Sequence, residues 1–243
     1  MKEIKNEKAI AGVKIFLSRT KILDPISHKA MTVFPLATES LVCFDYLTLD
    51  EAIEKGKIEV TESSESGSVP NLLVKNKGTR PVLMMTGEEV VGAKQNRTLN
   101  TDILIKGKSE VVIPVSCTEQ GRWHPSTEKM ETVKFASPPR TRAGIGESVF
   151  RSLSGGKGYA SNQSEVWASV GEYQTLYNVD SPTGAIKDVY DSKETDLREY
   201  VDNLKPDKDT WNGMAVVIGS RFVGIDIFDS SKTMSKLWDK LIR

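Results

Sequence analysis

The chain has 243 residues, and a chain of this length buries roughly 70–75% of its unfolded surface on folding, so a substantial core is expected. Its 33 Lys and Arg residues balance 33 Asp and Glu residues, which argues against general nucleic-acid binding but leaves room for a local basic pocket. No run reaches the ~20 apolar residues of a membrane span, no apolar region follows the N-terminal lysines, and Cys43 and Cys117 lie too far apart for a CxxC unit. We therefore expect a soluble, cytoplasmic protein with two free thiols.

The first 120 residues alternate short apolar runs with turn residues, a pattern typical of strands. Residues 13–17 and 41–46 have the β-branched and aromatic content of two such strands. A helix is predicted after Thr48, because Thr48 and Glu51 make a capping box and Gly56 provides a C-terminal stop. Further strands are predicted over residues 58–61, 71–74, 82–85, 102–105 and 111–115, with a polar loop over residues 61–70.

Helical periodicity appears later in the chain. Residues 161–179 form one predicted helix, with Ser161 or Asn162 as its cap, and residues 195–206 form another. Residues 124–160, which precede these helices, are rich in Ser, Pro, Arg, Gly and Lys. This composition predicts a mobile loop or lid.

The C-terminal part predicts a strand pair and a final helix. Two strand-like runs flank Gly219 and Ser220, which suit a two-residue hairpin turn, and Asp229 or Ser230 can cap the closing helix. The predicted fold class is α+β, with a mixed, mainly antiparallel sheet, packed helices, and a C-terminal β-hairpin followed by a terminal helix. We find no internal repeat and predict a single domain over residues 1–243.

Two polar runs interrupt the apolar strands. They read GEEVVGAKQNRTLN at residues 87–100 and PVSCTEQGRW at residues 114–123. Acids, amides and arginines at this density are costly to bury unless they are paired, so what they face decides their role. We interpret the runs as two loops that lie at one end of a sheet, provided that the strands between them pair with one another.

The first run has the chemistry to hold a nucleotide-like ligand. Arg97 suits phosphate or carboxylate through a bidentate fork, and Lys94 suits it as a point charge. Gln95, Asn96 and Asn100 supply amides suited to ribose hydroxyls or a base edge. In an extended chain both faces of this segment would be polar, which favours a cavity lining over a surface strand.

The neighbouring carboxylates are candidate general acids or bases. Glu88 and Glu89 are adjacent, so on a strand they point to opposite faces, and either needs burial to move its pKa toward neutrality. Glu119 is the third candidate. The alternative is a structural ion network with Lys94 and Arg97. A hard divalent cation bound by Glu119 and one of the other two carboxylates is chemically permitted, whereas a site built on the two histidines is not expected.

The second run offers a thiol and an aromatic ring. Cys117 beside Arg122 could be a nucleophile with a depressed pKa, with His124 as its partner, but we favour a buried, inert thiol at a strand end. Gln120 and Arg122 repeat the amide and guanidinium chemistry of the first run. Trp123 suits stacking on a base or sugar as well as packing in the core.

The two polar runs resemble the signature of a bacterial and archaeal family, the ADP-ribosylglycohydrolase- and rhodanese-phosphatase-superfamily-associated protein domain. The resemblance extends to residues 46–62, 69–78 and 162–167 and to the closing strands and helix. It implies an α+β domain, a link to NAD and ADP-ribose metabolism, and polar residues gathered at one site. By position these are Glu88, Glu89, Lys94, Gln95, Asn96, Arg97, Asn100, Ser116, Glu119, Gln120, Arg122 and Trp123.

Two functional hypotheses follow. The first is an enzyme, a hydrolase or transferase acting on an ADP-ribose-like or other nucleotide-derived metabolite, in which Arg97 and Arg122 bind phosphate beside an acid/base carboxylate. The second is a non-catalytic ligand-binding or interaction module that uses the same residues. In both, the expected partner is a small nucleotide-like molecule, with no membrane and no general nucleic-acid binding. A third interpretation, a polar structural cluster without a ligand, predicts that alanine at Gln95 or Arg97 severely lowers stability.

Overall fold

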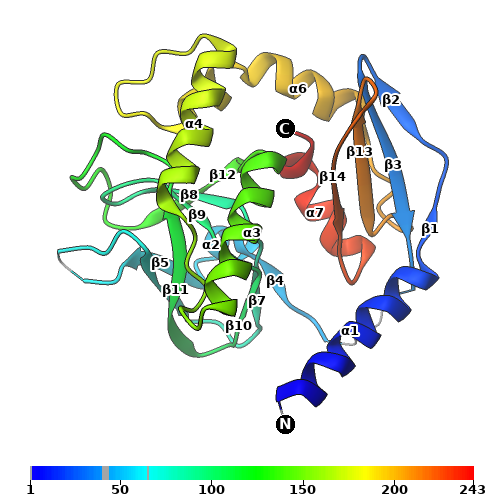
Figure 1. Cartoon of the computed structure of the whole chain (residues 1–243), viewed down its shortest axis with the longest axis horizontal. Helices are drawn as coiled ribbons and strands as arrows, with labels where there is room; N and C mark the ends of the chain where they lie inside the picture. Colours follow the sequence, from blue (N-terminus) through cyan, green and yellow to red (C-terminus); the bar gives the residue numbers. More distant parts are fainter. Residues whose placement is uncertain (1, 40–43, 65) are drawn as a thin grey trace. The chain divides into compact units, whose positions relative to one another are not determined.

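The structure is a computed structural model that describes residues 2–39, 44–64 and 66–243 (Figure 1). It contains two compact units. The first comprises residues 1–44 and 200–238, and the second comprises residues 45–199 and 239–243. Helices and mostly antiparallel strands are mixed along the chain, which confirms the α+β class. The single domain over residues 1–243 stays a prediction.

The first unit contains an antiparallel sheet in the order β1-β3-β13-β14, with β2 also paired to β3. Its strands are β1 (Lys21–Ile22), β2 (Ile26–His28), β3 (Met31–Ala37), β13 (Gly213–Ile218) and β14 (Arg221–Ile227). Gly219 adopts a φ of 60° between β13 and β14, which confirms the predicted hairpin. The closing helix α7 (Ser231–Ile242) follows, and the Ser230 side chain accepts a hydrogen bond from the Thr233 amide at 3.3 Å.

One strand prediction in this unit is wrong. Residues 13–17 lie inside α1 (Lys2–Arg19), because the Ala, Lys and Glu residues before them favour a helix more strongly than the β-branched residues favour a strand. For the other strand, predicted over residues 41–46, residues 41–43 with Cys43 lie outside the described residues, and residues 44–46 are not part of a strand.

The second unit is built on a six-stranded antiparallel sheet in the order β12-β8-β9-β11-β6-β5. Its strands are β5 (Ile58–Glu62), β6 (Asn71–Asn76), β8 (Glu88–Gly92), β9 (Arg97–Leu99), β11 (Ser109–Cys117) and β12 (Met130–Ala136). Strands β12 and β5, the two ends of this order, contact each other, so the sheet curls around an inner face.

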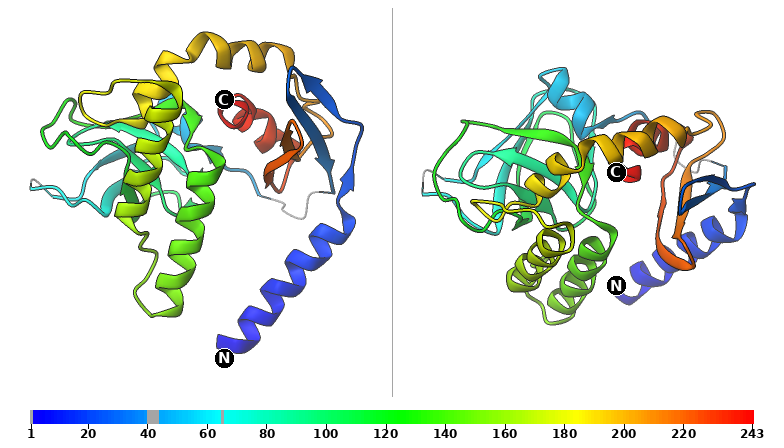
Figure 2. Two further views of the ribbon diagram at one scale, coloured as in Figure 1. Left: turned by 45° about the horizontal axis from the view of Figure 1, so that its top comes forward. Right: turned by 90° about the horizontal axis from the view of Figure 1, so that it is seen from above.

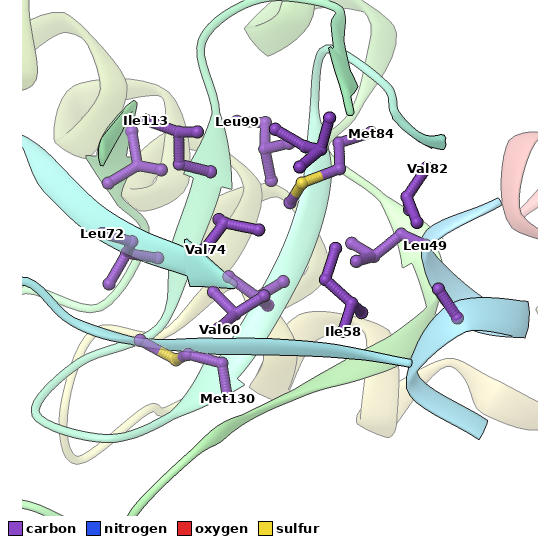
Figure 3. Packing of buried hydrophobic residues seen from close by; sticks show 14 of the residues in the cluster. Leu49, Ile58, Val60, Leu72, Val74, Val82, Met84, Leu99, Ile113 and Met130 are labelled. Atoms are coloured by element: carbon purple, nitrogen blue, oxygen red, sulfur yellow. The ribbon is translucent and has the colours of Figure 1, made fainter. Parts of the chain in front are cut away.

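The inner face of the curled sheet carries the main hydrophobic core (Figure 3). Val60, Val74, Leu99 and Ile113 pack there. Helix α2 (Leu49–Glu54) adds Leu49, and a small sheet of β4 (Leu47–Thr48), β7 (Val82–Met84) and β10 (Ile103–Ile105) adds further apolar side chains. The Thr48 side chain accepts from the Glu51 amide, and the Glu51 carboxylate accepts from the Thr48 amide, which confirms the capping box.

Helices cover the outer side of this sheet. Helix α4 (Gln163–Tyr177) starts at Asn162, whose side chain accepts from the Ser164 amide, and it contacts β11, α3 and α5. The helices α3 (Pro139–Ser154) and α4 lie side by side (Figure 2). The other helices of this region are α5 (Ile186–Ser192) and α6 (Glu194–Asn203).

The segment 124–160 contains regular structure. Strand β12 and helix α3 lie within it, and Pro139 occupies the first turn of α3, where proline is tolerated because its missing N–H has no partner to lose. A lid role for this segment stays a prediction. Within the described ranges, no helix is long and apolar enough to cross a membrane.

Candidate functional site

The first polar run is not a loop. It forms the hairpin of β8 and β9, in which Glu89 lies opposite Thr98. The strand arrangement predicted between the two runs is also wrong, because β10 pairs with β7 and not with β11. The two runs meet because β9 pairs directly with β11, which places Arg97 opposite Cys117. The polar side chains suggested a loop, but strands pair through their backbone, so these residues form regular strands.

The pairing of strands places three polar residues at one end of the apolar inner face. Side chains alternate along a strand, so Arg97 shares the inner face with Leu99, and Cys117 shares it with Val115. On β5, Glu62 shares this face with Val60 for the same reason. We call Glu62, Lys94, Arg97, Cys117 and Trp123 the Arg97 cluster.

Arg97 is the central residue of this cluster and is fully buried. Its Nη1 donates to the Asn96 carbonyl at 3.3 Å, whereas Nε and Nη2 are buried and have no acceptor among the residues that the structure describes. Burial lowers the pKa of Arg97, although the nearby Cys117 and Glu62 groups act in the opposite direction. A buried guanidinium with two unsatisfied donors is costly, so this arrangement calls for an explanation.

An aromatic ring and a carboxylate complete the Arg97 cluster. The Trp123 ring lies 5.7 Å from Arg97 Cζ and 5.6 Å from Lys94 Nζ, within cation–π range, and Trp123 keeps 45% of its surface exposed. Glu62 Oε1 accepts from the Lys94 amide at 3.1 Å, and its buried Oε2 has no donor within the described ranges. The cluster therefore holds unpaired donors and an unpaired acceptor close to a half-exposed ring.

The loop after β5 closes over this cluster through a glycine. Gly67 has a φ of 77°, and a Cβ there would lie 3.0 Å from Lys94 Cδ, 3.2 Å from Trp123 Cζ2 and 3.3 Å from Glu62 Oε2. Both the positive φ and this close approach favour glycine. The polar loop predicted over residues 61–70 thus contributes directly to the cluster.

Arg122 and Glu119 form a separate, fully paired unit. Arg122 Nη2 lies 2.7 Å from Glu119 Oε2, and Arg122 Nε donates to Oε1 at 2.9 Å. Arg122 Nη1 also donates to the Ala93 and His124 carbonyls. Burial acts to raise the pKa of Glu119, but the Arg122 guanidinium and the Asn96 amide lower it overall. The guanidinium of Arg122 fixes the β8–β9 turn.

Glu88 and Glu89 point to opposite faces of β8, and each is held by groups other than Arg97. Glu88 Oε1 lies 2.8 Å from Lys240 Nζ, which also pairs with Asp50 at 2.8 Å. Burial raises the pKa of Glu88 even though Lys240 acts to lower it. The ion network considered for Glu88 therefore exists, but with Lys240 and Asp50 as its members.

Glu89 is enclosed by hydroxyl groups on the outer face. Thr118 Oγ1 donates to its carboxylate at 2.7 Å, and Ser137 and Thr98 also contribute hydrogen bonds. Burial raises the pKa of Glu89 to about 7, because these hydroxyls only partly offset the loss of water. Glu89 is fully buried, as Arg97 is, so a ligand reaches either residue only through a local opening.

The amides and the thiol mostly satisfy one another. The Cys117 thiol donates to Gln95 Oε1 at 3.1 Å, Gln95 Nε2 donates to the carbonyl of the exposed Gln120, and the Asn96 side chain accepts from the Gly92 amide at 3.1 Å. Burial raises the pKa of Cys117, which supports the inert thiol. On the outer face, the Ser116 hydroxyl donates to Asn100 Oδ1, and Asn100 Nδ2 donates to the Tyr159 carbonyl.

The structure thus brings together Lys94, Arg97 and Trp123, whereas the three predicted carboxylates are held by other groups. It adds Glu62, which sequence reasoning missed. The alternation of Val60 and Glu62 along β5 was a usable signal, since it puts that carboxylate on the core side of the strand. Within the described part of the chain, no group of three or more His, Cys, Asp or Glu side chains is arranged to hold a metal ion.

Comparison with known families gives a match over most of the chain. A family model described as ARPP-1, the ARG and Rhodanese-Phosphatase-superfamily-associated Protein domain, matches residues 19–243. The chain belongs to this family. The ARPP-1 match covers both polar runs and every residue of the Arg97 cluster, and it confirms the resemblance seen in the sequence. No curated protein and no solved structure matches the chain.

Proposed function

We propose that this ARPP-1 domain binds a small phosphate-bearing ligand of the ADP-ribose class at the Arg97 cluster. The observation that carries the proposal is the buried Arg97 guanidinium, whose Nε and Nη2 have no acceptor in the described part of the chain. These two N–H groups lie along one edge of the guanidinium plane. That edge binds two oxygens of a phosphate side by side, in the bidentate geometry that arginine favours.

The surroundings of Arg97 suit the rest of such a ligand. The half-exposed Trp123 ring offers a face for stacking a base or sugar, and Lys94 adds a second positive charge over the same ring. The free Oε2 of Glu62 is an acceptor for a ribose hydroxyl. Membership in a family named for its association with ARG supports the choice of ADP-ribose as the ligand class.

Catalysis on this ligand is a second candidate function, and Glu62 is the observation that favours it. Glu88 and Glu119 are held by cations, and Glu89 is enclosed by hydroxyls. Among the described residues, Glu62 keeps one carboxylate oxygen without a donor, close to the cation that would hold the phosphate. It is therefore the carboxylate placed for general acid/base work at this site.

A thermal-shift series tests the binding proposal. We expect ADP-ribose to stabilise the protein most, ribose 5-phosphate less, and adenosine little. A ligand at 100 times its dissociation constant adds roughly 2.7 kcal/mol to the free energy of unfolding. Equal shifts with adenosine and ADP-ribose would contradict phosphate recognition by Arg97.

Product analysis of the same mixtures tests catalysis. A Glu62→Gln variant that binds the ligand but loses turnover would support a catalytic role for Glu62. Unchanged turnover in that variant would show that Glu62 takes no part in the reaction.

The same arginine separates a ligand site from a structural cluster. Replacing Arg97 by Met removes a buried cation whose donors are unsatisfied, so we expect the free energy of unfolding without ligand to stay within about 1 kcal/mol or to rise. If Arg97 instead stabilises the folded protein, Arg97→Met should lower the free energy of unfolding by about 3 kcal/mol or more. Urea denaturation of both proteins measures this difference.

A further inference from the structure

A second cationic site lies at the opposite end of the curled sheet. Five basic residues line a cavity of about 210 Å³ there, together with Leu47, Gly78 and Thr79. These basic residues are Lys55, Lys57, Lys77, Arg80 and Lys108. Such a concentration is unexpected in a chain whose formal net charge is zero.

The register of the strands explains why three of these lysines meet. Ile58 of β5 pairs with Asn76 of β6, which pairs with Ser109 of β11. Lys57, Lys77 and Lys108 each lie one position beyond this row, so they occupy neighbouring positions at the end of three strands. Like charges placed opposite one another destabilise a sheet. The fold therefore places like charges side by side, where a bound anion would be stabilised.

The backbone around the three lysines is firmly held. The Lys77 and Gly78 amides both donate to the Lys57 carbonyl, at 2.7 and 3.2 Å, and the Lys108 amide donates to the Gly78 carbonyl at 2.9 Å. The fully buried Asn76 side chain donates to the Arg80 carbonyl at 2.9 Å and accepts from the Gly78 amide at 3.0 Å. The backbone positions from which the three lysine side chains project are thus fixed by the fold.

Acidic neighbours neutralise only part of this charge. Glu51 pairs with Lys55 at 3.4 Å, Glu59 with Lys77 at 2.5 Å, and Asp45 with Arg80 at 2.5 Å. Neither Lys57 nor Lys108 has a carboxylate partner in the described part of the chain, and the Lys108 ammonium instead donates to the Lys77 carbonyl at 2.7 Å. The cavity therefore keeps two positive charges in excess.

This cavity cannot share a small ligand with the Arg97 cluster. Strand β11 runs from Ser109 beside the cavity to Cys117 in the cluster. At about 3.3 Å per residue the two ends are roughly 26 Å apart. One small ligand therefore cannot occupy both sites at once.

We propose that this lysine cavity binds the polyphosphate group of a soluble small molecule, such as a diphosphate or triphosphate. Its limited volume suits one compact anionic group, and the absence of excess positive charge over the whole chain disfavours a nucleic-acid backbone. Lysine ammonium groups bind phosphate oxygens as point charges from several directions.

Calorimetric titration of the whole chain with inorganic pyrophosphate tests the proposal. We expect the double variant Lys57→Gln/Lys108→Gln to bind about ten-fold more weakly or worse, since each lost ammonium removes a charge-assisted contact. The control double variant Lys106→Gln/Lys134→Gln makes the same change in net charge outside the cavity and should bind like the wild type. Repeating the comparison of the two double variants in an Arg97→Met background removes phosphate binding at the Arg97 cluster, so a loss confined to Lys57→Gln/Lys108→Gln there belongs to the cavity.

Three outcomes would overturn the proposal. The first is the absence of saturable pyrophosphate binding to the wild type. The second is equal weakening in the two double variants, which would indicate nonspecific attraction. The third is tighter binding of a short DNA or RNA duplex than of pyrophosphate, lost in Lys57→Gln/Lys108→Gln, which would assign the cavity to a nucleic-acid backbone.

Discussion

At the scale of single residues, Glu89 links the stability of the protein to pH. Its pKa rises from 4.5 to about 7 on folding, because burial costs more than the hydroxyl hydrogen bonds return. Between these two values the unfolded chain ionises Glu89 while the folded protein keeps the proton. The free energy of unfolding therefore falls as the pH rises through this window, by roughly 3 kcal/mol for this group alone.

The variant Glu89→Gln should lose this dependence. The free energy of unfolding of the variant minus that of wild type should increase by roughly 3 kcal/mol from pH 4.5 to pH 7.5. Urea denaturation at several pH values measures this difference. Exposed Glu131 on β12 provides the control, and Glu131→Gln should follow the wild-type curve. A Glu89→Gln curve parallel to wild type would show that Glu89 titrates alike in the folded and unfolded states.

Glu62 shows what residue-level sequence reasoning misses. Lys94, Arg97 and Trp123 stood out because they lie within polar runs, and the structure places them together. Glu62 lies 32 positions before Lys94 in an ordinary strand, yet it accepts from the Lys94 amide. That contact depends on the order of strands in the sheet, which side-chain chemistry in one sequence does not reveal.

At the scale of elements, a buried ion pair ties the end of α7 to β8. Lys240 is 4% exposed and contacts both Glu88 and Asp50 at 2.8 Å. Replacing Lys240 by Met leaves the Glu88 carboxylate buried beside Asp50 without its cation, so we expect a loss of about 3–5 kcal/mol. Adding Glu88→Gln should recover part of this loss, because the unpaired buried charge is then gone. A double-mutant cycle by urea denaturation measures both effects.

If the losses of stability from Lys240→Met and Glu88→Gln are additive, the result would contradict an ion pair between these residues. The exposed pair of Lys187 and Asp191 is a suitable control, because both residues lie on the surface of α5. Breaking it with Lys187→Met should cost at most about 1 kcal/mol.

Elements with a strong local signal were predictable, and strand pairing was not. The capping box at Thr48 and the glycine turn at Gly219 are encoded by neighbouring residues, and both predictions are confirmed. The hairpin of β8 and β9 was mistaken for a loop because its side chains are polar. Those side chains are satisfied by ion pairs and hydrogen bonds from distant segments, such as Lys240 on Glu88 and Ser137 on Glu89.

At the scale of the whole molecule, the curled sheet of the second unit presents two cationic ends with different chemistry. One end buries Arg97 beside a carboxylate and an aromatic ring, and the other gathers Lys57, Lys77 and Lys108 around an open cavity. Neither could be found from composition, since the chain as a whole is neutral. The polar runs in the sequence pointed to the first end, and only the register of three strands reveals the second.

The most direct test of the central claim is calorimetric titration of ADP-ribose into wild type, Arg97→Lys and the surface control Arg140→Lys. The control exchanges the same two residue types at an exposed ion pair with Glu172. We predict that Arg97→Lys, which keeps the charge but loses the two-pronged donor edge, weakens binding about ten-fold or more, while Arg140→Lys leaves it unchanged. Equal affinity for ADP-ribose in Arg97→Lys and wild type, or no binding to wild type, would contradict the account.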